Sequence, residues 1–249
     1  MTYDMRANTV SISGHGGDTI EAYLTQPTGI EDRPAGGVVV IHHMPGYDES
    51  TKEITRRFAA NGYPAVCPNL YSREAPGASP DDAAAAARAA GGVPDERLVG
   101  DVAGAIEALK ALPVCNGKVA TIGYCSGGRQ SFLAACSLPL DAAVDCYGAF
   151  VLASPPEGAP VSVASLRDRV TDLGCPLLGL FGSEDQFPSP EEVDELEKLL
   201  GEHGKEFEFH SYPGAGHAFF NVERPSYRPE AAADGWNRIW DFFGRHLVS

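Results

Sequence analysis

Three side chains that cooperate in nucleophilic catalysis follow apolar segments of this sequence. Cys125 lies in "GYCSGG" after "KVATIGY", Asp185 follows "PLLGLFGSE", and His217 follows "FEFHSYPGAG". In such a set the thiolate attacks a carbonyl carbon, the histidine holds and returns the proton, and the carboxylate orients the histidine. We therefore predict that Cys125, Asp185 and His217 are the catalytic residues of an acyl-transfer site.

The residues around Cys125 favour a sharp turn from a strand to a helix. Gly123 and Gly127 stand two positions before and after the cysteine, so the backbone can turn without side-chain clashes. The thiol would then face the N-terminus of the next helix, whose positive end favours a thiolate. We predict that the backbone N–H of Ser126 donates to the oxyanion of the reacting carbonyl, and that the N–H of Met44 is the second donor.

Each of these residues also has an ordinary structural interpretation. A cysteine is often a small buried side chain, a histidine in a glycine-rich loop is often a turn residue, and Asp185 stands where a helix cap is needed. The combination of three such residues in the order nucleophile, acid, histidine is more specific, because it is the order of the α/β-hydrolase triad. The chain has six cysteines and no C-x-x-C pair, and we expect most of the others to be packed thiols: Cys67, Cys115, Cys136, Cys146 and Cys175.

Segments with strand and helix patterns alternate along the chain. This alternation predicts an α/β fold with a mostly parallel central sheet, helices on both faces and no large cap domain. No change in composition divides the chain, so we expect a single domain over residues 1–249. Residues 151–172 are the least regular and either cover the site or form a surface loop. The expected strands are 9–14, 19–27, 36–46, 64–71, 118–125, 142–148, 176–185 and 205–217, and the expected helices are 49–63, 78–92, 95–112, 126–137, 189–204 and 231–247.

Composition restricts the classes of partner. The formal net charge is −15, which opposes binding to nucleic acid or to anionic membranes. No apolar run reaches the roughly 18 residues that a membrane span needs. The first residues lack the basic and apolar regions of a secretory signal. These features predict a cytoplasmic protein with a small-molecule partner, and the histidine and cysteine spacings predict no metal site.

Three stretches resemble the dienelactone hydrolase (carboxymethylenebutenolidase) family, in order and over nearly the whole chain. They are "VCPNLYSREAPG" (66–77), "NGKVATIGYCSGG" (116–128) and "PGAGHAF" (213–219). The resemblance implies an α/β-hydrolase fold and a Cys–His–Asp triad at Cys125, His217 and Asp185. It implies hydrolysis of a lactone or ester through a thioester, without cofactor, as in the degradation of chlorinated aromatics. For the assembly it implies a monomer or a weak homodimer.

The sequence departs from the family pattern at the positions that activate the cysteine and bind a substrate carboxylate. His43 stands where the family has a glutamate, and it could accept a proton from the thiol or contact the substrate. The adjacent His42 should point to the other face of its strand. Asn221 replaces one carboxylate-binding arginine, and Arg88 is a loose counterpart of the other. The substrate is therefore either uncharged or held differently.

Other residues are weaker candidates for a substrate pocket. Tyr124, Tyr71 and Phe219 follow or end strands, where aromatic side chains line pockets or belong to the core. Arg129 lies one helical turn after the cysteine, and we expect it to pair with a carboxylate of the protein. Arg73 is expected to brace its own loop.

Two kinds of function fit these residues. The first is a cysteine-dependent hydrolase of a small lactone or ester, with an esterase or acyltransferase on an uncharged substrate as the nearest alternative. The second is a non-enzymatic thiol-based sensor or binding protein on the same fold, which the altered residues at His43 and Asn221 would favour. Dependence of acyl turnover on Cys125 separates the two.

Overall fold

A computed structural model describes residues 2–30, 32–159 and 161–248. Its centre is one eight-stranded sheet with the strand order β1-β2-β4-β3-β5-β6-β7-β8. Both pairings of β2 are antiparallel, whereas the pairings from β4 through β8 are parallel. The strands are β1 (Met5–Ser13), β2 (Thr19–Pro27), β3 (Ala35–Ile41), β4 (Ala65–Pro68), β5 (Cys115–Tyr124), β6 (Ala142–Cys146), β7 (Leu177–Gly182) and β8 (Phe207–Tyr212).

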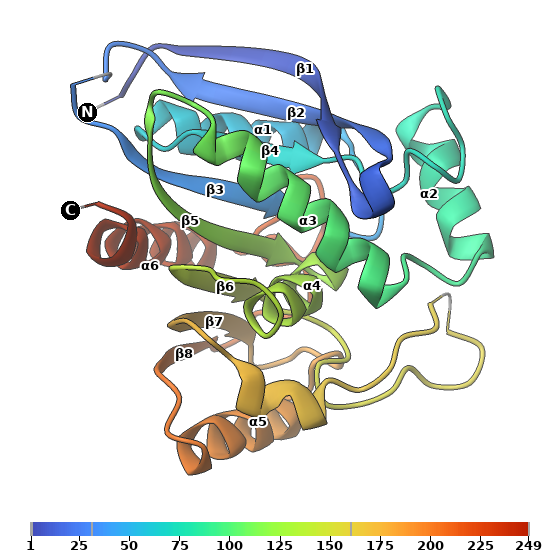
Figure 1. Ribbon diagram of the computed structural model, residues 1–249. Helices are drawn as coiled ribbons and strands as arrows, with labels where there is room; N and C mark the ends of the chain where they lie inside the picture. Colours follow the sequence, from blue (N-terminus) through green and yellow to red (C-terminus); the bar gives the residue numbers. More distant parts are fainter. Residues whose placement is uncertain (1, 31, 160, 249) are drawn as a thin grey trace.

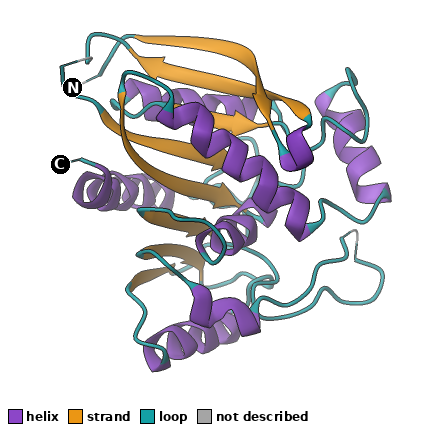
Figure 2. Ribbon diagram, in the orientation of Figure 1, coloured by secondary structure: helices purple, strands orange, loops and turns teal. Residues whose placement is uncertain are grey.

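Helices cover both faces of the sheet, as Figures 1 and 2 show. Helices α2 to α5 pack on one face, and α1 and α6 pack on the other. Two short 3-10 helices, η1 (His15–Gly17) and η2 (Arg167–Asp172), lie between strands. The predicted α/β-hydrolase fold without a large cap is thereby confirmed. The helices are α1 (Glu49–Ala60), α2 (Pro80–Ala89), α3 (Asp95–Lys110), α4 (Ser126–Ala135), α5 (Pro190–Glu202) and α6 (Pro229–Leu247).

The central strand β3 shows why the sheet is buried on both faces. Successive side chains of a strand point to opposite faces. Val39 and Ile41 accordingly join the core under α3 and α4, whereas Val38 and Val40 join the core under α1 and α6. All four are fully buried. This explains the continuous apolar run in the sequence, since a strand covered on both faces has no polar side.

Local capping residues set where several helices begin. The side chain of Asp48 accepts a hydrogen bond from the Thr51 N–H at the start of α1, and Ser79 and Ser189 cap α2 and α5 in the same way. Proline follows both serines, where its fixed φ suits the first helical turn.

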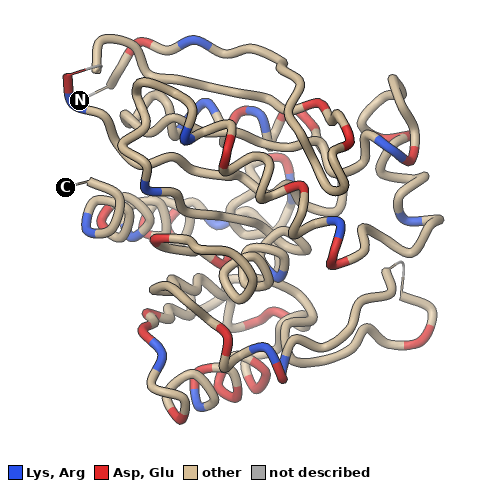
Figure 3. Tube along the Cα trace, viewed as in Figure 1, with Lys and Arg blue, Asp and Glu red and all other residues tan. Residues whose placement is uncertain are grey.

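Charged side chains are spread unevenly over the surface. Figure 3 shows acidic residues along α5, at the edge of the sheet that ends in β8.

Within the described residues, no helix combines the length and apolar character needed to cross a bilayer.

Candidate active site

Cys125 occupies the sharp turn between β5 and α4. Its backbone has φ 58° and ψ −123°, a conformation that residues with a side chain rarely adopt. The turn depends on close approaches of the backbone. A Cβ on Gly123 would overlap the carbonyl oxygen of Gly127, and a Cβ on Gly127 would overlap that of Ile41. Glycine is therefore needed on both sides of Cys125.

This crowding predicts a strong effect of a single methyl group. The Gly123→Ala change is expected to lower the free energy of unfolding by about 3 kcal/mol, because the carbonyl of Gly127 is backbone and cannot move away without opening the turn. The matched control is Gly244→Ala in α6, where a Cβ would meet open space. This control should be stabilised by about 0.5–1 kcal/mol. Urea unfolding of both variants measures the difference, and equal stabilities would contradict the described turn.

Cys125 is the partly exposed cysteine that lines a cavity at the carboxyl ends of the strands. Cys115 is also partly exposed, but it lies at the opposite end of β5, with its Sγ 3.8 Å from the Lys118 carbonyl oxygen. The other four thiols are buried, and burial raises their pKa values, so they stay protonated. The pKa is raised to about 12 for Cys136 and Cys175, and it is raised for Cys67 and Cys146 as well. The prediction that most cysteines are packed thiols is confirmed.

His217 and Asp185 form a hydrogen-bonded pair beside Cys125. The Nδ1 of His217 donates to Oδ2 of Asp185 over 2.8 Å. The other oxygen of Asp185 accepts the N–H of Phe187 over 2.9 Å, so the carboxylate is held at both ends. The ring of His217 also contacts the ring of Tyr147, with centroids 5.1 Å apart. These contacts fix the imidazole through its Nδ1 and its ring face.

The surroundings of His217 favour its charged form. Burial by itself lowers the pKa of His217, but hydrogen bonds with Asp185 and with Cys125, and the negative charge that each of these groups has when ionised, outweigh burial and raise it to about 10. An imidazolium at this position stabilises a thiolate on Cys125. The N-terminus of α4, which begins at Ser126, adds its positive dipole end.

The two predicted oxyanion donors, the N–H groups of Ser126 and Met44, belong to residues that line the same cavity as Cys125. Two hydrogen bonds hold the loop that carries Met44 in place. The hydroxyl of Tyr71 donates to the Met44 carbonyl oxygen over 3.1 Å, and the N–H of Gly46 donates to the His43 carbonyl oxygen over 2.9 Å. Fixed donors of this kind cost little reorganisation during a reaction.

His42 supports this loop as a buried neutral side chain. Its Nδ1 donates to the His43 carbonyl oxygen over 2.9 Å, and its Nε2 accepts the N–H of Leu70 over 3.2 Å. Burial lowers the pKa of His42 to about 4, so the ring stays neutral in the physiological range. Its edge contact with Tyr71, at 4.6 Å between centroids, joins the loop after β3 to the loop after β4. His42 thus has a structural role, as expected from its direction.

Of the residues predicted to contact the substrate, Tyr71 lines this cavity, whereas His43, Arg88, Tyr124 and Phe219 do not. Tyr124 and Phe219 are in the core, 5% and 0% exposed. Tyr124 is the last residue of β5, and its side chain packs in the core under α1 and α6. His43 binds Asp48 through a 2.6 Å hydrogen bond and lines a second, much smaller cavity of about 40 Å³. Arg88 does not line the cavity of Cys125, although its charge acts on the nearby Tyr71 hydroxyl.

Asp48 shows how His43 is held. Burial raises the pKa of Asp48, but the hydrogen bonds from His43 and from the N–H of Thr51 outweigh burial and lower it to about 2. The carboxylate is therefore ionised and anchors the imidazole to the first turn of α1. This partner orients His43 toward α1.

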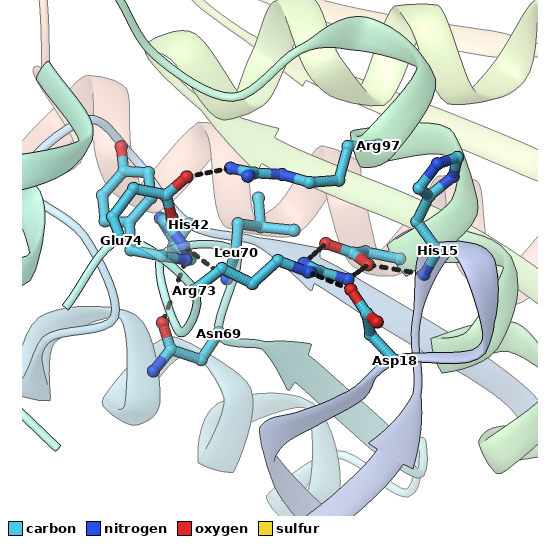
Figure 4. A network of polar contacts seen from close by, with 10 residues as sticks. His15, Asp18, His42, Asn69, Leu70, Arg73, Glu74 and Arg97 are labelled. Carbon is cyan, nitrogen blue, oxygen red and sulfur yellow. Dashed lines mark hydrogen bonds and ion pairs between the residues drawn. The ribbon is translucent and has the colours of Figure 1, made fainter. Parts of the chain in front are cut away.

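Arg129 and Arg73 were expected to bind groups of the protein and not the substrate, and both form ion pairs with aspartates. Arg129, only 3% exposed in its side chain, forms two hydrogen bonds with Asp95, of 2.8 and 3.0 Å. Arg73 forms the same bidentate pair with Asp101, of 2.8 and 2.9 Å, and also binds Asp18 over 2.7 Å. Figure 4 shows this second network, in which Arg73 ties the hairpin of β1 and β2 to α3.

The Arg73 network predicts a stability effect remote from the site. Asp101 is fully buried, so Arg73→Met leaves a charge without its partner and is expected to cost about 3 kcal/mol of unfolding free energy. The exposed pair Arg167–Glu195 supplies the control, since Arg167→Met should change stability by less than about 0.5 kcal/mol. Denaturant titrations compare them. Equal changes in the unfolding free energy would show that the Arg73 network stabilises the fold no more than a surface ion pair does.

The cavity beside Cys125 has a volume of about 620 Å³. Most of its walls are apolar, and residues from the irregular segment 151–172 form one of them. These residues, Pro156, Ala159, Val161 and Val163, therefore lie over the site. Sequence reasoning did not single out several of the lining residues: Val93, Gln130, Phe150, Pro156, Ala159, Val161, Val163, Glu184 and Phe187.

The mostly parallel sheet, the cysteine at a sharp strand-to-helix turn and the His–Asp pair after later strands are the features of an α/β-hydrolase. The sequence profile of the dienelactone hydrolase family matches residues 20–247. The chain belongs to the dienelactone hydrolase family and is a hydrolase.

Individual relatives agree with this assignment. A protein of Escherichia coli (strain K12) named "Putative carboxymethylenebutenolidase" is 34% identical over 243 residues, covering 92% of this chain and 84% of the relative. A protein of Synechocystis sp. with the same name is 29% identical and covers 99% of this chain and 100% of the relative. The crystal structure named "Putative Dienelactone Hydrolase" from Klebsiella pneumoniae superposes with a TM-score of 0.84 at 29% identity, covering 97% of this chain and 99% of that one.

Proposed function

We propose that this protein hydrolyses a carboxylic ester or lactone through a thioester on Cys125. The observation that carries the proposal is the set formed by the Cys125 thiol, the His217 imidazole and the Asp185 carboxylate on the wall of one cavity. The hydrolase class of the family and the names of its relatives support the same reaction.

In the proposed mechanism the Cys125 thiolate attacks the carbonyl carbon, and the N–H groups of Ser126 and Met44 hold the resulting oxyanion. As the oxyanion collapses, the bond to the leaving oxygen breaks and His217 gives that oxygen its proton. His217 then takes a proton from water, which attacks the thioester carbonyl. Collapse of the second oxyanion releases the acid and restores the thiolate. Asp185 holds His217 in the required tautomer throughout.

We propose that the reaction proceeds in the cytoplasm without a cofactor and that residues 1–249 form one domain. Support for one domain comes from the single sheet, because β1 belongs to it and α6 packs on it. Strand β1 forms one edge of the sheet, and α6, near the C-terminus, packs Leu247 against Gly36 of β3. The start of β1 and the end of α6 accordingly lie on the same side of the molecule in Figure 1.

Initial rates with cis- and trans-dienelactone and with 4-nitrophenyl acetate test the function, each measured with wild type and with Cys125→Ala. The proposal is supported if wild type hydrolyses the lactones or the ester and Cys125→Ala does not. The substrate that wild type hydrolyses faster shows whether the site prefers lactones or open esters. Equal rates with and without the thiol would overturn it.

A further inference from the structure

Residues 153–159 and 161–164, which we name the flap, form a loop whose Pro156, Ala159, Val161 and Val163 line the cavity of Cys125. The loop after β6 that leads into it is anchored by backbone hydrogen bonds, since the N–H of Leu166 donates to the Val151 carbonyl oxygen over 2.7 Å. Farther out, the N–H of Ser162 donates to the Gly91 carbonyl oxygen over 3.0 Å. The flap therefore reaches from the β6 end of the sheet to the end of α2, as Figures 1 and 2 show on the right.

The described residues of the flap present an apolar inner side. Val161 and Val163 are half-buried and line the cavity, whereas Ser162 and Ala164 next to them are exposed. This alternation is that of an extended chain with one face turned inward. Residues 153–163 include a single charged residue, Glu157, and Figure 3 shows this stretch almost without charge.

Aromatic side chains form another apolar wall of the cavity. The rings of Phe150 and Phe187 are in contact, with centroids 5.2 Å apart, and both residues line the cavity. Phe187 is 43% exposed, which leaves a large apolar surface for a ligand to cover. With the flap valines and Val93, these rings enclose much more space than a five-membered lactone ring fills.

The ionisable groups on the described walls do not favour a substrate carboxylate. Arg129 is the arginine of the lining, and Asp95 and two carbonyl oxygens already bind its guanidinium. The carboxylates of the lining are those of Glu184 and Asp185, and the imidazolium of His217, which also lines the cavity, is already paired with Asp185. Gln130 adds an amide whose oxygen is buried without a hydrogen-bond partner in the described structure, and which is available to a neutral donor of a ligand.

We propose that the flap and the Phe150–Phe187 pair bind a bulky, uncharged apolar group of the substrate, so that the preferred ester carries such a group. The inference rests on the proposed function, because it names the substrate class of the same site. Burying an additional methylene in such a pocket should raise kcat/KM about three- to fourfold, until the cavity is filled.

Two ester series test the proposal, because the bulky group can belong to either half of the ester. The first lengthens the acyl chain of 4-nitrophenyl esters from acetate to hexanoate, and the second lengthens the alcohol of acetate esters from methyl to hexyl. We expect kcat/KM to rise at least tenfold along one series. In the 4-nitrophenyl series, hexanoate should exceed the adipate half-ester, which has the same chain length and a terminal carboxylate, at least tenfold.

Variants of the flap identify the residues responsible. Val163→Ser should lower kcat/KM for the long ester about tenfold and for the short ester less than twofold, whereas Ala164→Ser, on the exposed side of the flap, should change neither. A flat profile in both series, or equal losses for short and long esters, would overturn the proposal. If Cys125→Ala retains the wild-type rate, the proposed function itself fails. Cys125-dependent hydrolysis without a size preference refutes only the substrate class.

Discussion

Cys125→Ala is expected to lower kcat/KM for 4-nitrophenyl acetate by about 10³-fold or more, because removal of an activated nucleophile leaves only the oxyanion donors and the binding pocket. The effect on stability should be small, since Cys125 is partly exposed at the cavity wall. Steady-state kinetics together with thermal unfolding separate the loss of chemistry from a loss of folded protein.

Two control variants sharpen this result. Cys115→Ala removes the other partly exposed thiol, at the opposite end of β5, and should keep the wild-type rate. Cys125→Ser keeps a nucleophile of similar size but offers a hydroxyl that His217 ionises less readily than a thiol, so it should also be far slower than wild type. A Cys125→Ala enzyme with a tenth or more of the wild-type kcat/KM would contradict the proposed nucleophile.

Asp185→Asn is expected to lower kcat about 10²- to 10⁴-fold, because the amide removes the negative charge that orients His217 and stabilises its protonated form. The hydrogen bond between Nδ1 and the Asp185 carboxylate is 2.8 Å long. An asparagine can present its NH₂ group to Nδ1 and so favour the wrong tautomer. Measurement of kcat with a fast-leaving ester checks the prediction, and a kcat near that of wild type would exclude Asp185 from the triad.

The same pair predicts how stability depends on pH. The folded structure raises the pKa of His217 from an ordinary value of 6.5 to about 10. A raised histidine pKa stabilises the folded state fully below pH 6.5, and that stabilisation is lost as the pH rises through about 10. The melting temperature of wild type should therefore fall between pH 7 and 10 by more than that of Asp185→Asn. Parallel curves for the two proteins would show that Asp185 is not responsible for the raised pKa.

Much of the architecture could be predicted because its signals are local. The run "AGGVVVI" of β3 has no polar side chain, and the glycines of "GYCSGG" reveal the turn around Cys125. The order of Cys125, Asp185 and His217 at strand ends could likewise be taken from sequence alone, because carboxyl ends of parallel strands meet at one edge of a sheet.

The walls of the cavity could not be predicted in the same way. A strand pattern gives the alternation of side chains but not which face borders the cavity, and for this reason Tyr124 was a candidate although it faces the core under α6. The flap contains Pro155, Pro156 and Gly158, and it lacks helical or strand periodicity except in the stretch from Val161 to Ala164. Its position depends on contacts with the distant α2 turn at Gly91.

Ion pairs between residues that are far apart in the chain could not be predicted from the sequence either. Arg73 was expected to brace its own loop, and it does so, but its partners Asp18 and Asp101 lie 55 and 28 residues away in the chain. Nothing in the local pattern of either aspartate identifies such a partner. The pairing follows only when η1, α3 and the loop after β4 are brought together, as in Figure 4.

The most direct test of the thioester mechanism is the mass of the enzyme during turnover. Wild type, mixed with excess 4-nitrophenyl acetate and quenched in acid, should gain the mass of one acetyl group, and peptide mapping should place it on Cys125. Hydroxylamine should remove it, as it does from thioesters. The expected result is full loss of the adduct in Cys125→Ala. An acetyl group on another residue, or rapid turnover with no adduct in wild type or in a deacylation-impaired His217→Asn variant, would contradict the account.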